Sequence, residues 1–179
     1  VQTCALPISI GLAVSGMFPW AEVLPYIVVQ ILGAMVGQLV VVASYKPYYD
    51  QTEDKLHVLG TFSTINSVGS KFNGFVNEFF GSFILFFGAL GITKAPFFQN
   101  NLGTAHLALG FLVWTLVASF GGPTGPGLNP ARDLGPRIMH AILPLKHKGD
   151  SQWSYSWVPV LAPIIASIVA IALYKALFI

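Results

Sequence analysis

The sequence predicts an all-α membrane protein. Of its 179 residues, 54% are hydrophobic and only 9% are charged, whereas soluble domains carry about 25% charged residues. The mean hydropathy of +0.69 agrees with this class. Four apolar segments are each long enough to cross a hydrocarbon core of about 30 Å as a helix. We therefore expect a bundle of transmembrane helices.

The four predicted spans are residues 23–45, 72–93, 102–121 and 153–174. Three of them contain no charged residue, and the second contains only Glu78. Aromatic residues lie near the ends of the first and last spans, where membrane interfaces favour them: Trp20, Tyr45, Trp153 and Trp157. A stripe of small residues in the last span predicts close helix packing: Ala162, Ala166 and Ala170.

Two connections join the first three spans. Residues 46–71 are rich in polar and charged side chains, which predicts a solvent-facing loop. Residues 94–101 form a short connector, and His106 follows it near a membrane interface. For His106 we favour a structural role over a functional one.

Residues 121–137, GGPTGPGLNPARDLGPR, are unusual in so apolar a chain. They combine five Gly and four Pro with one Asn, two Arg and one Asp. Irregular backbone at membrane depth is tolerated only where protein buries it or where it lines a wet cavity. We therefore expect this segment to line a cavity. The alternative is a surface loop with an exposed arginine.

A short helix is predicted to follow. Asn129 is a favourable N-cap, and Pro130 is favourable at the first helical position. Residues 130–143 then give about three turns before Pro144, too few to cross the membrane. This pattern predicts a re-entrant half-helix whose positive dipole end faces the cavity.

The chemistry predicted for the cavity suits small neutral molecules rich in hydroxyl groups. Arg132 adds a permanently charged fork of N–H donors one turn into the half-helix. The extended backbone of residues 125–128 can bring its carbonyl oxygens close to the lumen because glycine permits a close approach. Acceptors and donors would thus face the same passage, while the dipole and Arg132 repel cations.

The stretch SFGGPTGPGLNPARDLGPR resembles the second asparagine–proline–alanine (NPA) loop of the major intrinsic proteins, the aquaporin and glycerol-facilitator family. The resemblance extends through YSWVPVLAPIIASIVAIALYK, FVNEFFGSFILFFGALGI and LPYIVVQILGAMVGQ, and it covers residues 10–179. It implies an aquaporin-like inverted-repeat bundle of six spans and two half-helices that meet at mid-membrane. It also implies one pore per subunit and usually a tetramer.

The resemblance implies roles for the residues around the half-helix. Asn129 would donate to the solute at the pore centre, and Arg132 would belong to the selectivity filter.

Val117 occupies a filter position that water channels fill with His, which favours a polyol-sized gap. Pro126 departs from the pattern of glycerol facilitators, which typically have an aromatic residue at this position. The loss of the aromatic ring implies a wider aperture. The glycerol-facilitator subgroup is further favoured by Asp133, Arg137 and Pro159.

Glu78 is the only acidic residue within a predicted span and is therefore a candidate functional residue. The resemblance implies that it accepts hydrogen bonds from the irregular segment, with Gln30 as a similar brace. The predicted pore residues are Val117, Pro126, Gly127, Leu128, Asn129, Pro130, Ala131 and Arg132. The predicted supports of the pore loop are Gln30, Glu78 and Asp133.

One half of the inverted repeat is incomplete. Residues 72–179 match a complete half, whereas the other half keeps one span and a half-helix remnant, SIGLAVSGMFPW. We interpret residues 1–179 as a single, partial channel domain, N-terminally truncated, that lacks the first two spans. Residues 1–9 are interpreted as non-native or as an artefactual join. Alone, this chain is not expected to be a competent channel.

The predicted function is a passive channel for glycerol and other small uncharged solutes, selective against ions and protons. We expect a multi-pass homotetramer in the cell membrane. Alternatives are a channel for water, dihydroxyacetone, urea or lactic acid, or a nonconducting fragment that acts only in assembly.

Three other function classes are not expected. The net charge of +2 gives no basic face for nucleic acid. No metal or other cofactor is expected, since Cys4 is the only cysteine and no Cys/His cluster has ligand spacing. An enzyme is not expected because no span places a nucleophile beside a base.

Overall fold

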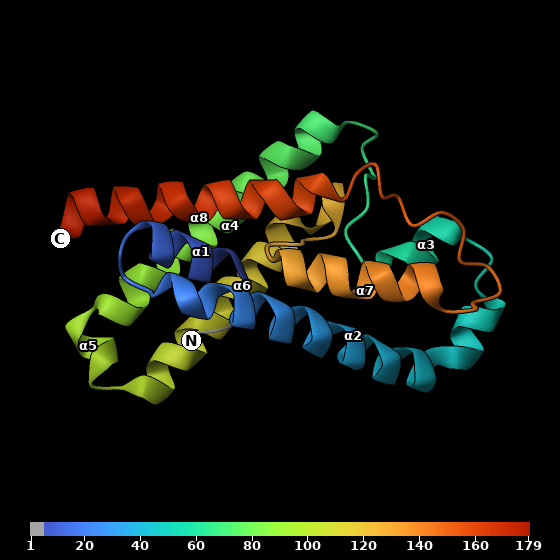
Figure 1. Ribbon diagram of the computed structural model, residues 1–179, viewed down its shortest axis with the longest axis horizontal. Coiled ribbons are helices and arrows are strands. Elements are labelled where there is room, and N and C mark those ends of the chain that lie inside the picture. Colours follow the sequence, from blue (N-terminus) through green and yellow to red (C-terminus); the bar gives the residue numbers. More distant parts are fainter. Residues whose placement is uncertain (1–5) are drawn as a thin grey trace.

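The computed structural model describes residues 6–179, and the regular structure within them is entirely helical (Figure 1). In chain order the helices are α1 (Leu6–Val14), α2 (Trp20–Gln51), α3 (Lys55–Gly60), α4 (Lys71–Lys94), α5 (Pro96–Gln99), α6 (Leu102–Thr124), α7 (Pro130–Ile142) and α8 (Trp157–Phe178). Four of them, α2, α4, α6 and α8, are long and apolar enough to cross a membrane. This finding confirms the four predicted spans, although their ends differ.

Helix α2 extends past the predicted end of the first span at residue 45. Lys46 and Asp50 form an ion pair one helical turn apart within this extension. The predicted solvent-facing loop over residues 46–71 is therefore wrong in its first part. It is also interrupted by α3, whose N-cap Asp54 accepts hydrogen bonds from two backbone N–H groups of the first turn, at 2.8 and 3.1 Å.

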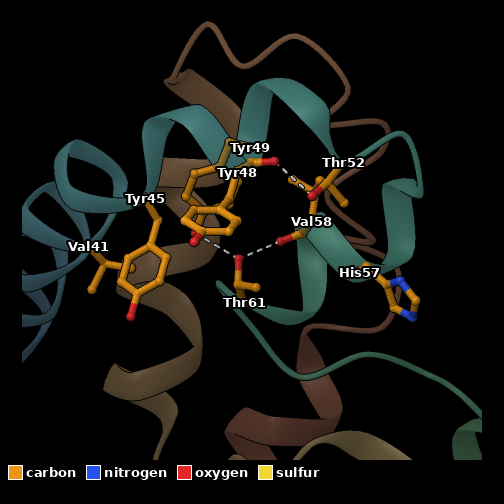
Figure 2. Close-up of a pocket in the computed structure, with 8 residues that line it drawn as sticks. All are labelled: Val41, Tyr45, Tyr48, Tyr49, Thr52, His57, Val58 and Thr61. Carbon is orange, nitrogen blue, oxygen red and sulfur yellow. Dashed lines mark hydrogen bonds between the residues drawn. The ribbon is translucent and has the colours of Figure 1, made fainter.

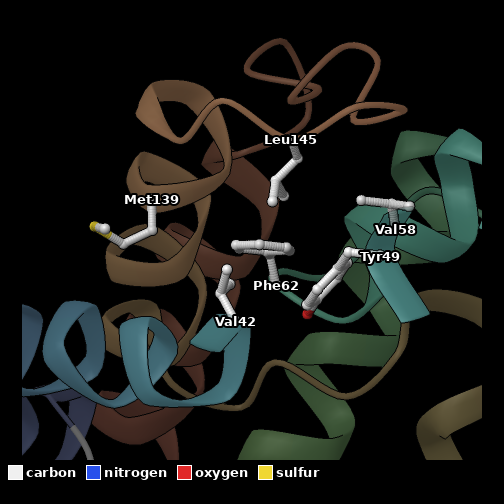
Figure 3. Packing of buried hydrophobic residues seen from close by; sticks show 6 residues of the cluster. All are labelled: Val42, Tyr49, Val58, Phe62, Met139 and Leu145. Atoms are coloured by element: carbon white, nitrogen blue, oxygen red, sulfur yellow. The ribbon is translucent and has the colours of Figure 1, made fainter. Parts of the chain in front are cut away.

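A buried hydrophobic cluster explains the extension of α2. It joins the end of α2 to α3, to α7 and to the connections around them, and its buried members are Val42, Tyr49, Val58, Phe62, Met139 and Leu145 (Figure 3). The rings of Tyr49 and Phe62 lie with their centroids 5.7 Å apart. Because Tyr49 has a core to pack into, its turn remains helical.

The ends of α6 and α8 also differ from the prediction. Helix α6 continues to Thr124, three residues past the predicted end at 121, although Pro123 lies in its last turn. Thr124 is fully buried, and its hydroxyl donates to Glu78 Oε1 at 2.7 Å. This tertiary contact holds the last turn in place. Helix α8 begins at Trp157, because residues 153–156 form turns.

Small residues allow α8 to pack closely in the bundle. Ala162, Ala166 and Ala170 are fully buried, as the small-residue stripe predicted. On α4, a Cβ atom added at Gly81 would lie 2.9 Å from the side chain of Leu128, so a larger residue there would force that side chain to shift.

The two short helices α1 and α7 meet at their N-terminal ends. The backbone N–H of Leu6 donates to Asn129 Oδ1 at 3.3 Å. Helix α1 packs against α8, and α7 packs against α2 (Figure 1). The half-helix remnant predicted at residues 9–20 thus begins earlier, at Leu6, and residues 1–5 of the segment interpreted as non-native lie outside the described residues.

Large apolar side chains remain exposed on two long helices. On α2 they include Leu24, Val28, Leu32 and Val36, and on α6 they include Leu107, Phe111 and Trp114. Exposed apolar surface of this extent is typical of helices that face lipid or other protein within a membrane.

Replacing Ala166 with Leu is expected to lower the free energy of unfolding by about 1–3 kcal/mol, because the added atoms have no space in the packed interface. The matched control is Val169→Leu, which enlarges an exposed side chain on the same helix. Denaturant titration of both variants in detergent micelles measures the difference. Equal stability of the two variants would contradict the packing argument.

Candidate pore site

The segment between α6 and α7 has an irregular backbone with two residues at positive φ. Gly125 has φ 63° and Leu128 has φ 54°. For a residue with a side chain, the left-handed region costs about 1–2 kcal/mol. Contacts from elsewhere in the fold must therefore hold Leu128 in this conformation.

Glu78 supplies these contacts from α4. Its side chain is 1% exposed. Oε1 accepts hydrogen bonds from the Gly127 N–H at 2.9 Å and from the Thr124 hydroxyl at 2.7 Å, and Oε2 accepts from the Leu128 N–H at 2.8 Å. The carboxylate thus binds two consecutive peptide groups of the segment and the last residue of α6.

The same hydrogen bonds orient the carbonyl groups. In a trans peptide the C=O points opposite to the N–H of the next residue, and the described chain contains no cis peptide bond. The carbonyls of Pro126 and Gly127 therefore point away from Glu78. Both residues line a cavity, so these oxygens are placed to act as acceptors on its wall.

Helix α7 begins at this cavity. Asn129 is its N-cap, and the side-chain oxygen accepts from the Ala131 N–H at 3.0 Å as well as from α1. Pro130 occupies the first helical position. The positive end of the helix dipole lies at this start of α7, which favours electronegative atoms of a solute.

The cavity has a volume of about 610 Å³. Most of its lining is apolar and comes from α4 and α6, including Phe86, Val113 and Val117, whereas Asn129 and Arg132 provide polar groups. A second hollow of about 400 Å³ lies beside α2 and shares Asn129 and Arg132 with the first. These two residues therefore stand where the two spaces meet.

Arg132 projects into this region from the first turn of α7. Its side chain is exposed, and Nη1 donates to the carbonyl oxygen of Phe62 at 3.4 Å. Within residues 6–179 no carboxylate lies within ion-pair distance of its guanidinium. Its guanidinium is therefore not held in an ion pair within the described chain.

The other predicted supports lie elsewhere. Asp133 is fully buried and accepts hydrogen bonds from Thr64 and Arg137 rather than from the 125–128 segment. Gln30 lines the second hollow, and its amide makes no hydrogen bond within the described residues. A bracing contact from Gln30 to the irregular segment is thus not among the hydrogen bonds of this structure.

Three residues of the site were not predicted from the sequence as part of it. Thr64 and Thr124 are buried threonines whose partners lie far away in the sequence. His106, for which a structural role was favoured, lines the larger cavity near the start of α6. A helical repeat of three or four residues, from His106 through Gly110 and Val113 to Val117, could have placed it on the same face as Val117.

A separate pocket of about 530 Å³ lies near the end of α2 (Figure 2). Its lining includes three tyrosines, and the hydroxyl groups of Tyr49 and Thr61 are 2.8 Å apart. None of the predicted pore residues lines it. It lies at the end of α2 and beside α3, and it shares no lining residue with the cavity at Asn129 and Arg132.

Comparison with known proteins agrees with this geometry. The sequence matches the major intrinsic protein family over residues 7–174. The chain belongs to the major intrinsic protein family. It is 52% identical over 171 residues to glycerol uptake facilitator protein-like 5 of Lactiplantibacillus plantarum, covering 96% of this chain and 68% of that protein. It is 46% identical over 217 residues to the glycerol facilitator-aquaporin gla of Lactococcus lactis, covering 95% of this chain and 75% of that protein.

The fold of this family member also matches a solved structure. An X-ray structure of the aquaglyceroporin from Plasmodium falciparum superposes with a TM-score of 0.81 at 27% identity, over 97% of this chain and 71% of that one. These findings confirm the predicted family and the partial aquaporin-like fold. The protein is a multi-pass membrane channel of the glycerol-facilitator type, as predicted, and not an enzyme.

Replacing Glu78 with Leu is expected to abolish glycerol flux in the full-length protein. Three hydrogen bonds would be lost, and the Leu128 conformation would have no support. Light-scattering measurements of vesicle swelling, normalised to the amount of inserted protein, test this expectation. The control is Glu22→Leu, at an exposed acidic residue near the start of α2. Unchanged flux per molecule in Glu78→Leu would refute the bracing role.

Proposed function

We propose that this chain forms part of the wall of a passage for glycerol and other small uncharged solutes. The observation that carries the proposal is the cavity at Asn129 and Arg132, where an apolar wall faces a short row of polar groups. A polyol has one face of carbon and one of hydroxyl groups, so it matches both. The relatives named as glycerol facilitators support the same solute class.

Ions are excluded in this proposal by charge and by desolvation. The dipole at the start of α7 and the guanidinium of Arg132 repel cations, including protons carried along a water chain. Anions lose their hydration shell against a largely apolar wall, which carries a high free-energy cost. A neutral solute meets neither barrier.

The aperture beside Arg132 is proposed to be wide. Val117 and Pro126 both line the cavity with Arg132, and neither brings a bulky aromatic ring to it. Such an opening admits glycerol and leaves room for water, dihydroxyacetone or protonated lactic acid as further solutes.

The functional unit is proposed to be a homotetramer of the full-length protein. The exposed apolar faces of α2 and α6 are consistent with burial against further helices, such as those of other subunits. Val117 is 43% exposed in this chain, so we expect the chain alone to lack a complete wall around the passage.

Transport by the full-length protein tests the proposal. Vesicles that contain it are expected to swell in a glycerol gradient at a rate well above that of empty vesicles, with no ion conductance in planar bilayers. Vesicles that contain only the present chain are expected to match empty vesicles. An ion current, or glycerol flux no faster than in empty vesicles, would overturn the proposed function.

Replacing Pro126 with Phe is expected to narrow the aperture. Permeability to erythritol should fall more than permeability to glycerol, because the larger polyol needs the space that the ring would fill. The matched control is Pro123→Phe, in the last turn of α6 and outside the cavity lining. An unchanged erythritol-to-glycerol ratio in Pro126→Phe would contradict the wide-aperture proposal.

A further inference from the structure

The connection between α3 and α4 contains residues 62–66, which we call the 62–66 loop and of which the first three are buried. Phe62 and Ser63 are each 1% exposed, and Thr64 is fully buried. A buried loop must find partners for its backbone groups, because water cannot satisfy them. These partners identify what the loop holds together.

Thr64 binds the half-helix through three of its polar groups. Its N–H and its hydroxyl both donate to Asp133 Oδ1, at 2.8 and 2.6 Å. Its carbonyl accepts from Arg137 Nη2 at 2.8 Å. Asp133 and Arg137 are fully buried and form an ion pair one helical turn apart on α7.

The neighbouring residues extend this attachment to the pore. The Ile65 N–H donates to the carbonyl of Thr124, the residue whose hydroxyl binds Glu78. The Phe62 carbonyl accepts from Arg132 Nη1 at 3.4 Å. The 62–66 loop thus binds α7 through Thr64. Two residues earlier in the same loop, the Phe62 carbonyl contacts the guanidinium of Arg132.

We propose that Thr64 is a positioning residue for Arg132. Its hydroxyl fixes the 62–66 loop on Asp133, and the loop then holds the Phe62 carbonyl where it keeps the Arg132 guanidinium against one side of the cavity. Arg132 needs such an acceptor because no carboxylate in the described chain pairs with it. The position of its guanidinium then sets the width available to a solute, so this inference rests on the proposed function.

The other hydrogen bonds of Asp133 allow the Thr64 hydroxyl to be removed without unfolding this region. Besides the Thr64 hydroxyl, the carboxylate accepts from the Thr64 N–H and from Nε and Nη2 of Arg137. Removing the hydroxyl leaves the buried charge paired and hydrogen-bonded. Loss of this bond therefore loosens the loop without leaving an isolated buried ion.

The experiment compares solute selectivity in the full-length protein with and without the hydroxyl. Thr64→Val keeps the shape of the side chain and removes the donor, whereas Thr64→Ser keeps the donor. The matched control is Thr61→Val, since the Thr61 hydroxyl binds Val58 and Tyr49 and not α7. Glycerol and erythritol permeabilities are measured in vesicles of the same preparation, so their ratio is independent of the amount of inserted protein.

We expect Thr64→Val to raise the ratio of erythritol permeability to glycerol permeability about threefold. A threefold change corresponds to only part of the free energy of one hydrogen bond. Thr64→Ser and Thr61→Val should keep the ratio of the unmodified protein. If Thr64→Val does not reach the membrane, the smaller Thr64→Ala removes the same donor and makes the same comparison.

An unchanged or lower ratio in the variant that lacks the hydroxyl overturns the inference, even if both permeabilities fall together, because a general loss of stability affects both solutes equally. If the unmodified protein carries no glycerol, the proposed function fails and the inference fails with it. Normal glycerol flux with an unchanged ratio removes only the role of Thr64.

Discussion

The carboxylate of Glu78 is the constraint on which the pore site depends. It lies buried on α4 and accepts hydrogen bonds from two consecutive peptide groups, at Gly127 and Leu128, and from Thr124. Water cannot take over this task at membrane depth. The orientation of the cavity carbonyls and the positive φ of Leu128 both follow from the position of this one side chain.

Local signals in the sequence predicted the main elements because each is determined by nearby residues. Four apolar runs of sufficient length predicted the long helices, and Asn129 followed by Pro130 predicted the start of α7. The ends of helices were less predictable where distant contacts decide them. Helix α2 continues past Lys46 because Tyr49 reaches a core built largely from other segments, and α6 reaches Thr124 because Glu78 holds it.

The burial of the 62–66 loop could not be predicted from its amino-acid sequence. The stretch TFSTINS is polar and has no helical or strand repeat, which is typical of an exposed connection. Its burial depends on an ion pair between Asp133 and Arg137, and the bond from Thr64 to Asp133 spans 69 residues of sequence. Asp133 was predicted as a support of the pore loop, but its partners could be identified only from the folded arrangement.

The contact between the tips of α1 and α7 has a consequence for how the molecule is made. The bond from Leu6 to Asn129 joins residues 123 positions apart, and the Ser167 hydroxyl donates to the carbonyl of Pro7 across 160 positions. Because the ribosome synthesises the chain from its N-terminal end, α1 is complete long before either partner exists. The contacts of α1 with α7 and α8 therefore form late in synthesis, and a nascent chain that stops before α8 leaves α1 without the helix on which it packs.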